Sequence, residues 1–197
     1  MPMVPYLPEN GVQYARRFAL HEQVPEENRL FYYSQGDNCT NFISQCVWAA
    51  YSGWLSYAPT AVNASRIRED VRMVTGVWYG SYWHIESTRW CRVEEFYTYA
   101  TAAKPRGPAA VQIAAGTFDT VAPSVLRRGD VVQLVVATYM PDRFGHGLYV
   151  TEPGTSWDGV RVCCQSYDRL DAPMSSFALY PQVYTRLRVL RFSSAVW

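Results

Sequence analysis

The chain lacks any apolar run long enough to cross a membrane and any marked excess of one charge. No stretch approaches the roughly 18 consecutive apolar residues that a membrane-spanning helix needs. Lys and Arg number 18 against 17 Asp and Glu, which gives a net charge of +1. A balanced charge does not predict a nucleic-acid-binding surface. We therefore expect neither a membrane span nor a nucleic-acid partner.

The first ten residues also lack the features of a secretory signal peptide. They read MPMVPYLPEN, with no basic segment followed by an apolar stretch. We therefore expect a cytoplasmic protein, unless a leader has been removed or the protein is released by another route. The oligomeric state stays open.

Candidate metal ligands are scarce. The chain has three histidines and five cysteines without a CxxC spacing, so a structural zinc site is not expected. An odd number of cysteines leaves at least one unpaired within the monomer. Buried free thiols are expected for all of them except Cys39. Cys163 and Cys164 are adjacent in a predicted strand, so their side chains should face opposite ways.

The 197 residues suit one domain, taken as residues 1–197. Apolar residues at helical spacing predict helices over 12–20, from Cys39 to just before Gly53, and over 92–103. Val-rich and alternating segments predict strands at 131–136, 145–152, 160–167 and 183–192. Helices followed by a run of strands predict an α+β fold with an antiparallel sheet.

Cys39 is the first candidate for chemistry, because it falls in the first turn of a predicted helix. The turn signal Gly36-Asp37-Asn38 precedes it, and Asp37 or Asn38 would cap the helix. A helix start supplies partial positive charge and free N–H groups, which lower a thiol pKa. The same N–H groups could hold the oxyanion of a tetrahedral intermediate.

An imidazole would complete the activation of a thiol, and three are available. His146 lies between two glycines at the start of a predicted strand, which leaves its ring accessible. His21 ends the first helix as a solvent-facing or capping residue. His84 lies in an aromatic loop, where it could line a cleft, although packing is the commoner role. Spacing alone leaves a Cys39–His146 pair undecided.

The segment GDNCTNFISQC resembles the motif of the putative amidase domain family, a branch of the papain-like fold related to NlpC-type cell-wall peptidases. The likeness continues in QYARRFAL, in Trp78-Tyr79 and EEFYTY, in LRRGDVV and in the histidine strand FGHGLYVTE. CQSYDRLDAPM is similar to a closing segment that usually reads Gln-His-Thr-x-Asp-Arg. The resemblance covers nearly the whole chain. It implies a papain-like (NlpC-type) α+β fold, with the nucleophile at a helix N-terminus packed on an antiparallel sheet.

The resemblance also implies the roles of three residues. Cys39 matches the family's nucleophile, His146 its base, and Gln165 the residue that orients the imidazole. The family often has His where this chain has Gln165, and Asp168 is the nearby alternative for the same role. The implied activity is a bacterial cysteine amidase or peptidase that forms an acyl-enzyme on a peptide or peptidoglycan stem. Such chemistry requires no metal or organic cofactor.

Other residues are candidates for binding substrate or for holding the helix. Asn41, Ser44 and Gln45 are expected to fix the helix through local hydrogen bonds. Two rival functions stay open: an inactive binding or structural module that keeps the fold, and an acyltransferase. The candidates for the substrate cleft are Asn38, beside the oxyanion, and the aromatic loop residues Trp78, Tyr79, Tyr82, Trp83 and His84.

Overall fold

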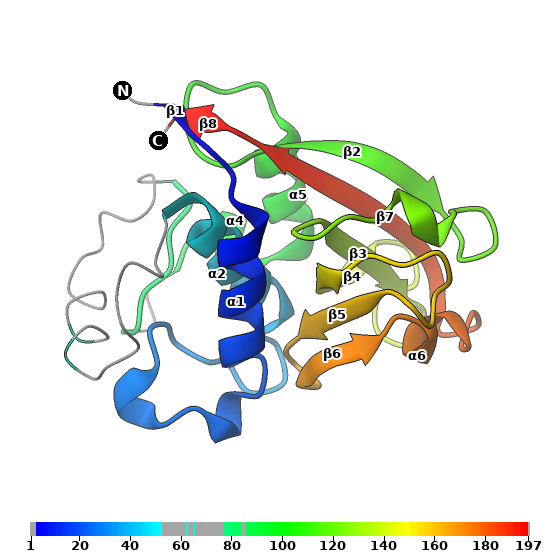
Figure 1. The fold of residues 1–197 in the computed structure, drawn as a ribbon, viewed down its shortest axis with the longest axis horizontal. Helices are drawn as coiled ribbons and strands as arrows, with labels where there is room; N and C mark the ends of the chain where they lie inside the picture. The colour runs from blue at the N-terminus through cyan, green and yellow to red at the C-terminus, as the bar shows by residue number, and fades with distance from the viewer. Residues whose placement is uncertain (1–2, 53–61, 63–64, 66–76, 84–85, 197) are drawn as a thin grey trace.

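An antiparallel six-stranded sheet forms one side of the protein, and the long helices pack on the other (Figure 1). The structure is a computed structural model that describes residues 3–52, 62, 65, 77–83 and 86–196. The strand order is β2-β7-β3-β4-β5-β6. Every pair in this sheet is antiparallel, so the predicted α+β class with an antiparallel sheet is confirmed.

The elements follow one another with the helices largely first. Among the described residues, the α-helices are α1 (Pro8–Phe18), α2 (Cys39–Ser52), α4 (Thr88–Cys91), α5 (Val93–Thr101) and α6 (Ser175–Ala178). The sheet contains β2 (Ala109–Gly116), β3 (Val131–Val136), β4 (Phe144–Glu152), β5 (Arg161–Cys164), β6 (Arg169–Pro173) and β7 (Tyr184–Ser193). Short 3-10 turns lie at His21–Gln23, Glu26–Asn28 and Pro123–Val125. Strands β1 (Met3–Val4) and β8 (Ala195–Val196) pair with each other and bring the two ends of the chain together (Figure 1). Within the described ranges, no helix combines the length and apolar character of a membrane span.

Alternation along the strands divides the apolar interior into two cores. The helix-side core contains Tyr149 of β4 together with residues of α1, α2 and α5. The far core, on the opposite face of the sheet, contains Leu148 and Val150 of the same strand. Cys163 lies in the helix-side core and Cys164 in the far core, so the prediction that they face opposite ways is confirmed.

Strands β2 and β6 are present although the sequence pattern did not predict them. Both are edge strands, each held by a single neighbour. The sequence of β2, AAVQIAAG, is rich in Ala and Gly, which have low strand propensity, and β6 ends in a proline. The helix predicted over 92–103 is α5, and the short helix α4 before it was not predicted. Arg92 separates the two helices, because its backbone is extended (φ −115°, ψ 133°).

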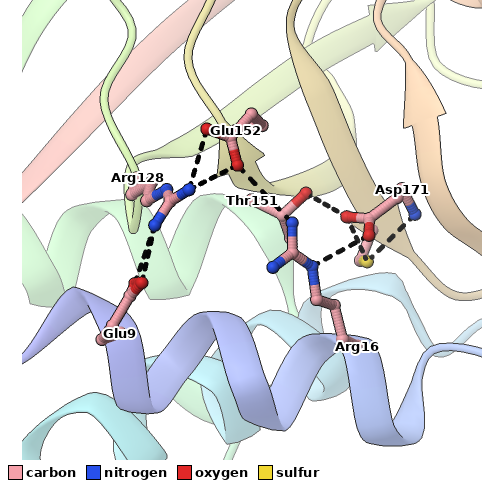
Figure 2. Close-up of polar contacts among 7 residues, drawn as sticks. Glu9, Arg16, Arg128, Thr151, Glu152 and Asp171 are labelled. Carbon is pink, nitrogen blue, oxygen red and sulfur yellow. Dashed lines mark hydrogen bonds and ion pairs between the residues drawn. The ribbon is translucent and has the colours of Figure 1, made fainter.

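A row of ion pairs joins α1 to the sheet (Figure 2). Arg128 pairs with Glu9 of α1 and with Glu152 of β4, with both N···O distances 2.6 Å. Arg16 of α1 pairs with Asp171 of β6 at 2.8 Å and with Glu152 at 3.6 Å. These side chains are partly exposed, so each pair stabilises the fold only slightly. Together they join α1 to β4 and to the edge strand β6.

Gly11 lets α1 approach both α2 and β4 closely. A methyl group there would overlap the Tyr149 hydroxyl and lie 2.9 Å from the Cys46 carbonyl oxygen. The Tyr149 hydroxyl is itself held by a 2.8 Å hydrogen bond to the Tyr6 hydroxyl. The contact therefore requires a residue without a side chain.

Gly11→Ala is expected to lower the free energy of unfolding by about 1–3 kcal/mol, because the added methyl group overpacks this contact. Helix propensity alone would change stability in the opposite direction, by about 1 kcal/mol. Urea denaturation followed by circular dichroism measures the sign. Gln13→Ala, at an exposed position of the same helix, is the matched control and should stay within about 0.5 kcal/mol of the wild type. A stabilised Gly11→Ala variant would contradict the close approach.

Candidate active site

Helix α2 begins at Cys39, and buried amide groups hold its first turn. The Asn38 carbonyl accepts the hydrogen bond from the Phe42 N–H at 2.9 Å. The Asn38 side-chain oxygen accepts from the Ser34 N–H and from the Asn41 amide, both at 2.9 Å. Its amide nitrogen donates to the Gln165 oxygen at 2.5 Å. Asn38 thus ties the helix start to the end of β5.

The same chain of hydrogen bonds continues along α2. Asn41 Oδ1 accepts from the Gln45 amide at 2.9 Å and from the Trp90 ring N–H at 2.7 Å. Gln45 in turn accepts from the Tyr14 hydroxyl at 2.8 Å, and the Ser44 hydroxyl donates to the Trp90 carbonyl at 2.7 Å. The prediction that Asn41, Ser44 and Gln45 fix the helix is confirmed.

The Cys39 thiol is almost covered, with 4% of the residue exposed. Its sulfur lies 3.9 Å from the Gly145 carbonyl oxygen, to which it donates, and 3.7 Å from the Thr40 hydroxyl. Burial raises the pKa of the Cys39 thiol, and this outweighs the lowering by the Thr40 side chain and by the Gly147 and Thr40 N–H groups. The expected net lowering at a helix start is therefore wrong, because desolvation of the thiolate dominates. Cys39 is a neutral thiol at neutral pH.

His146 is directed to the far face of β4. Leu134, its direct partner on β3, and Leu148, two residues further along β4, both lie in the far core. Gly147, between His146 and Leu148, faces the helices, since a Cβ there would lie 3.1 Å from Ile43. The imidazole lies near the Phe177 ring, with 6.2 Å between centroids.

The electrostatic surroundings of His146 keep its imidazole neutral. Burial, followed by the positive charge of Arg169, lowers the pKa of His146 to about 4. At pH 7 the ring is therefore in the form that can accept a proton.

Cys39 and His146 meet at one pocket of about 390 Å³ at the end of the sheet. They reach it from different sides of β4, and no hydrogen bond joins the thiol to the imidazole among the contacts of the described residues. The pocket is lined by Gly36, Asp37, Cys39, Val136, Thr138, Tyr139, Gly145, His146, Ser166, Tyr167, Arg169, Phe177, Val183 and Tyr184.

Gln165 and Asp168 lie away from the imidazole that each was expected to orient. The Gln165 amide nitrogen donates to the Phe18 carbonyl at 2.7 Å, while its oxygen accepts from Asn38. Asp168 accepts from the His21 N–H at 2.9 Å and from the Tyr33 hydroxyl at 3.3 Å. Gln165 shares the orientation of Cys163, toward the helices, whereas His146 faces the far core. Gln165 therefore holds the start of α2 rather than the imidazole ring of His146.

The predicted substrate-binding residues are distributed away from the pocket. Trp78 is fully buried and packs on Trp90, with 4.7 Å between centroids, so it is a core residue and not a cleft wall. Asn38 is 1% exposed and its amide is engaged as described, so it does not face substrate. Neither Tyr79 nor the exposed Trp83 belongs to the pocket lining. His84 lies outside the described residues.

The pocket contains functional candidates that the sequence argument did not single out. Arg169, at the start of β6, is the most informative, because its charge acts on His146. Its signal in the sequence is the Asp-Arg pair of the closing segment. Tyr139 and Tyr167 are exposed at 59% and 81% and flank the opening. Loop residues of this kind carry no periodicity, so the sequence alone did not locate them.

A buried arginine fixes the start of β4 beside the site. Arg188 donates to Gln133 at 2.6 Å and pairs with Glu94 at 2.9 Å. Its guanidinium lies between two rings, 3.6 Å from the centroid of Tyr97 and 4.0 Å from that of Phe144. Glu94 also accepts the Phe144 N–H at 3.0 Å. These contacts anchor the backbone at Phe144, directly before Gly145 and His146.

These features define an α+β protein in which a buried thiol at a helix start and an imidazole on an inner strand of an antiparallel sheet share one pocket. The model of a family described as a putative amidase domain matches residues 5–188. The chain belongs to this family, and membership suggests a hydrolase that acts on amide bonds. No curated protein and no solved structure matches the chain.

The lowered pKa of His146 predicts a pH dependence of stability. Between pH 6.5 and about 4 the unfolded imidazole takes up a proton that the folded one does not. The free energy of unfolding should therefore fall as the pH is lowered through this window. His146→Gln should remove this part of the fall, as measured by urea denaturation at several pH values. Above pH 6.5 the free energies of unfolding of the wild type and of His146→Gln should change in parallel with pH. Equal slopes of the two curves below pH 6.5 would contradict a neutral, desolvated imidazole in the folded protein.

Proposed function

We propose that the protein is a cysteine-dependent amide hydrolase of papain-like (NlpC-type) architecture, with Cys39 as nucleophile and His146 as general base. The observation that carries the proposal is their shared pocket, in which the thiol stands at the start of α2. The pKa of His146, about 4, keeps the imidazole neutral at pH 7 and able to accept a proton, and it also makes the resting imidazole a weaker base than a free one.

In the proposed reaction the Cys39 sulfur attacks the amide carbon while His146 accepts the thiol proton. The proton passes directly after rotation of the imidazole, or through one water molecule. The N–H groups around the sulfur stabilise the oxyanion. The imidazolium then gives its proton to the leaving amine, which leaves an acyl-enzyme. Water, deprotonated by His146, hydrolyses the acyl-enzyme and restores the thiol.

Gln165 has an indirect role in this proposal. Through Asn38 it holds the turn before Cys39, so it acts as a positioning residue for the nucleophile. The proposed substrate class is a peptide or peptidoglycan-stem amide, which rests on the family resemblance. The surrounding aromatic side chains, among them Tyr139 and Tyr167, suit an extended substrate.

One observation favours a rival function, a non-catalytic binding module. The Cys39 thiol donates to the Gly145 carbonyl, and burial raises its pKa. A resting thiol of this kind is inert until a base removes its proton. Reactivity that depends on His146 therefore discriminates between the two functions, and analysis of products with and without an added amine separates hydrolysis from acyl transfer.

Iodoacetamide between pH 6 and 8 is expected to alkylate Cys39 at least about tenfold faster than Cys91, because His146 removes the thiol proton. Cys91 is a suitable internal reference, since it is partly exposed and burial raises its pKa to about 11. His146→Ala should slow the reaction of Cys39 by about 100-fold and leave that of Cys91 unchanged. Timed labelling with peptide mapping by mass spectrometry measures both rates.

Hydrolysis of stem-like peptides should be abolished in Cys39→Ala and retained in Cys91→Ala, the matched control. Product formation is followed by mass spectrometry. Equal alkylation of the two cysteines, or a Cys39 rate independent of His146, would overturn the proposed nucleophile and support the binding module.

A further inference from the structure

Arg169 is set apart from the other well-anchored arginines of the protein. Four of them pair with carboxylates: Arg16, Arg128, Arg188 and Arg191. Arg169 has no carboxylate partner among the described residues. Its Nη1 donates to the Ser176 hydroxyl at 3.0 Å, and its guanidinium carbon lies 4.8 Å from the centroid of the Phe177 ring. The guanidinium is thus held in place by neutral groups, with donors left over.

Arg169 lines the pocket that Cys39 and His146 share. Its charge reaches the reacting groups, because it contributes to the lowered pKa of His146. A positive charge beside the base opposes protonation of the imidazole. A negatively charged ligand next to Arg169 would reduce that opposition while it is bound.

A second pocket continues the first across the Cys39 region. It has a volume of about 270 Å³ and shares Asp37, Tyr139 and Gly145 with the first. The Cys39 sulfur lies 3.9 Å from the carbonyl oxygen of Gly145, so it is close to this boundary. Arg169 lines only the first pocket, whereas Asp37 lines both. A substrate amide at the sulfur would therefore extend into both pockets, with one of its sides facing Arg169.

We propose that Arg169 is a specificity-determining residue that binds a carboxylate carried by the substrate on one side of the cleaved amide. Guanidinium groups bind carboxylates through paired N–H donors, and the interaction is strongest where water is partly excluded. Favoured substrates would then be amides with a free carboxylate close to the cleaved bond. This inference rests on the proposed function, since it assumes that Cys39 attacks an amide in this pocket.

Two alkylating reagents of the same shape test the inference. Iodoacetate and iodoacetamide both transfer a CH₂ group to the sulfur: an S–C bond forms, the C–I bond breaks, iodide leaves and the thiol proton is released. They differ in that iodoacetate carries a carboxylate. The ratio of their rates at Cys39 cancels an effect of a substitution on the nucleophilicity of the sulfur, because both reagents react with the same thiol.

Arg169→Gln is expected to lower the iodoacetate-to-iodoacetamide rate ratio at Cys39 by about tenfold, the loss of one charge-assisted interaction. Arg169→Lys should restore part of the ratio, because it keeps the charge. The matched control is Arg17→Gln, an exposed position of α1 outside the pocket lining, which should leave the ratio unchanged. Peptide mapping reads out the rates.

The wild-type protein gives an independent test that requires no folded variant. Millimolar acetate should slow alkylation of Cys39 by iodoacetate more than acetamide at the same concentration does. A ratio unchanged in Arg169→Gln, or equal effects of acetate and acetamide, would overturn the inference and leave the proposed function standing. If neither reagent prefers Cys39 over Cys91, the proposed nucleophile fails and the inference fails with it.

Discussion

The position of the Cys39 sulfur depends on a chain of buried side-chain amides. Asn38, Asn41, Gln45 and Gln165 bond to one another and to backbone groups, and each is no more than 6% exposed. A buried amide left without a hydrogen-bond partner costs about 1–3 kcal/mol. This set of hydrogen bonds therefore favours a single arrangement of the four side chains. It joins α1, α2 and the end of β5. The amide residues of the motif therefore serve to hold the thiol.

Local features of the fold could be predicted from the sequence, while relations between strands could not. The helix that starts at Cys39 follows from its apolar spacing, and the opposite directions of Cys163 and Cys164 follow from strand geometry alone. The pairing of Gln165 with His146 is different, because it depends on which face of the sheet the helices cover. That face is set by register and by an irregularity in the β3–β4 pairing near His146. The spacing of residues along the sequence shows neither the strand register nor this irregularity.

The chemistry of the pocket rests on desolvation of two neutral groups. Burial raises the pKa of Cys39 and lowers that of His146, so it acts against the charged form of each. The resting pair is a thiol and an imidazole rather than an ion pair. In the proposed reaction, transfer of the thiol proton would then accompany the attack of the sulfur.

Strand β4 separates the two proposed reactants, and this separation has a consequence for how the site can change. Cys39 lies at the start of α2 and contacts the backbone of Gly145, whereas His146 faces the far core and lies near Phe177. A substitution in the far core is therefore expected to act first on His146, and one in α2 first on Cys39. The two halves of the site can therefore diverge separately over evolutionary time, although they open into the same pocket.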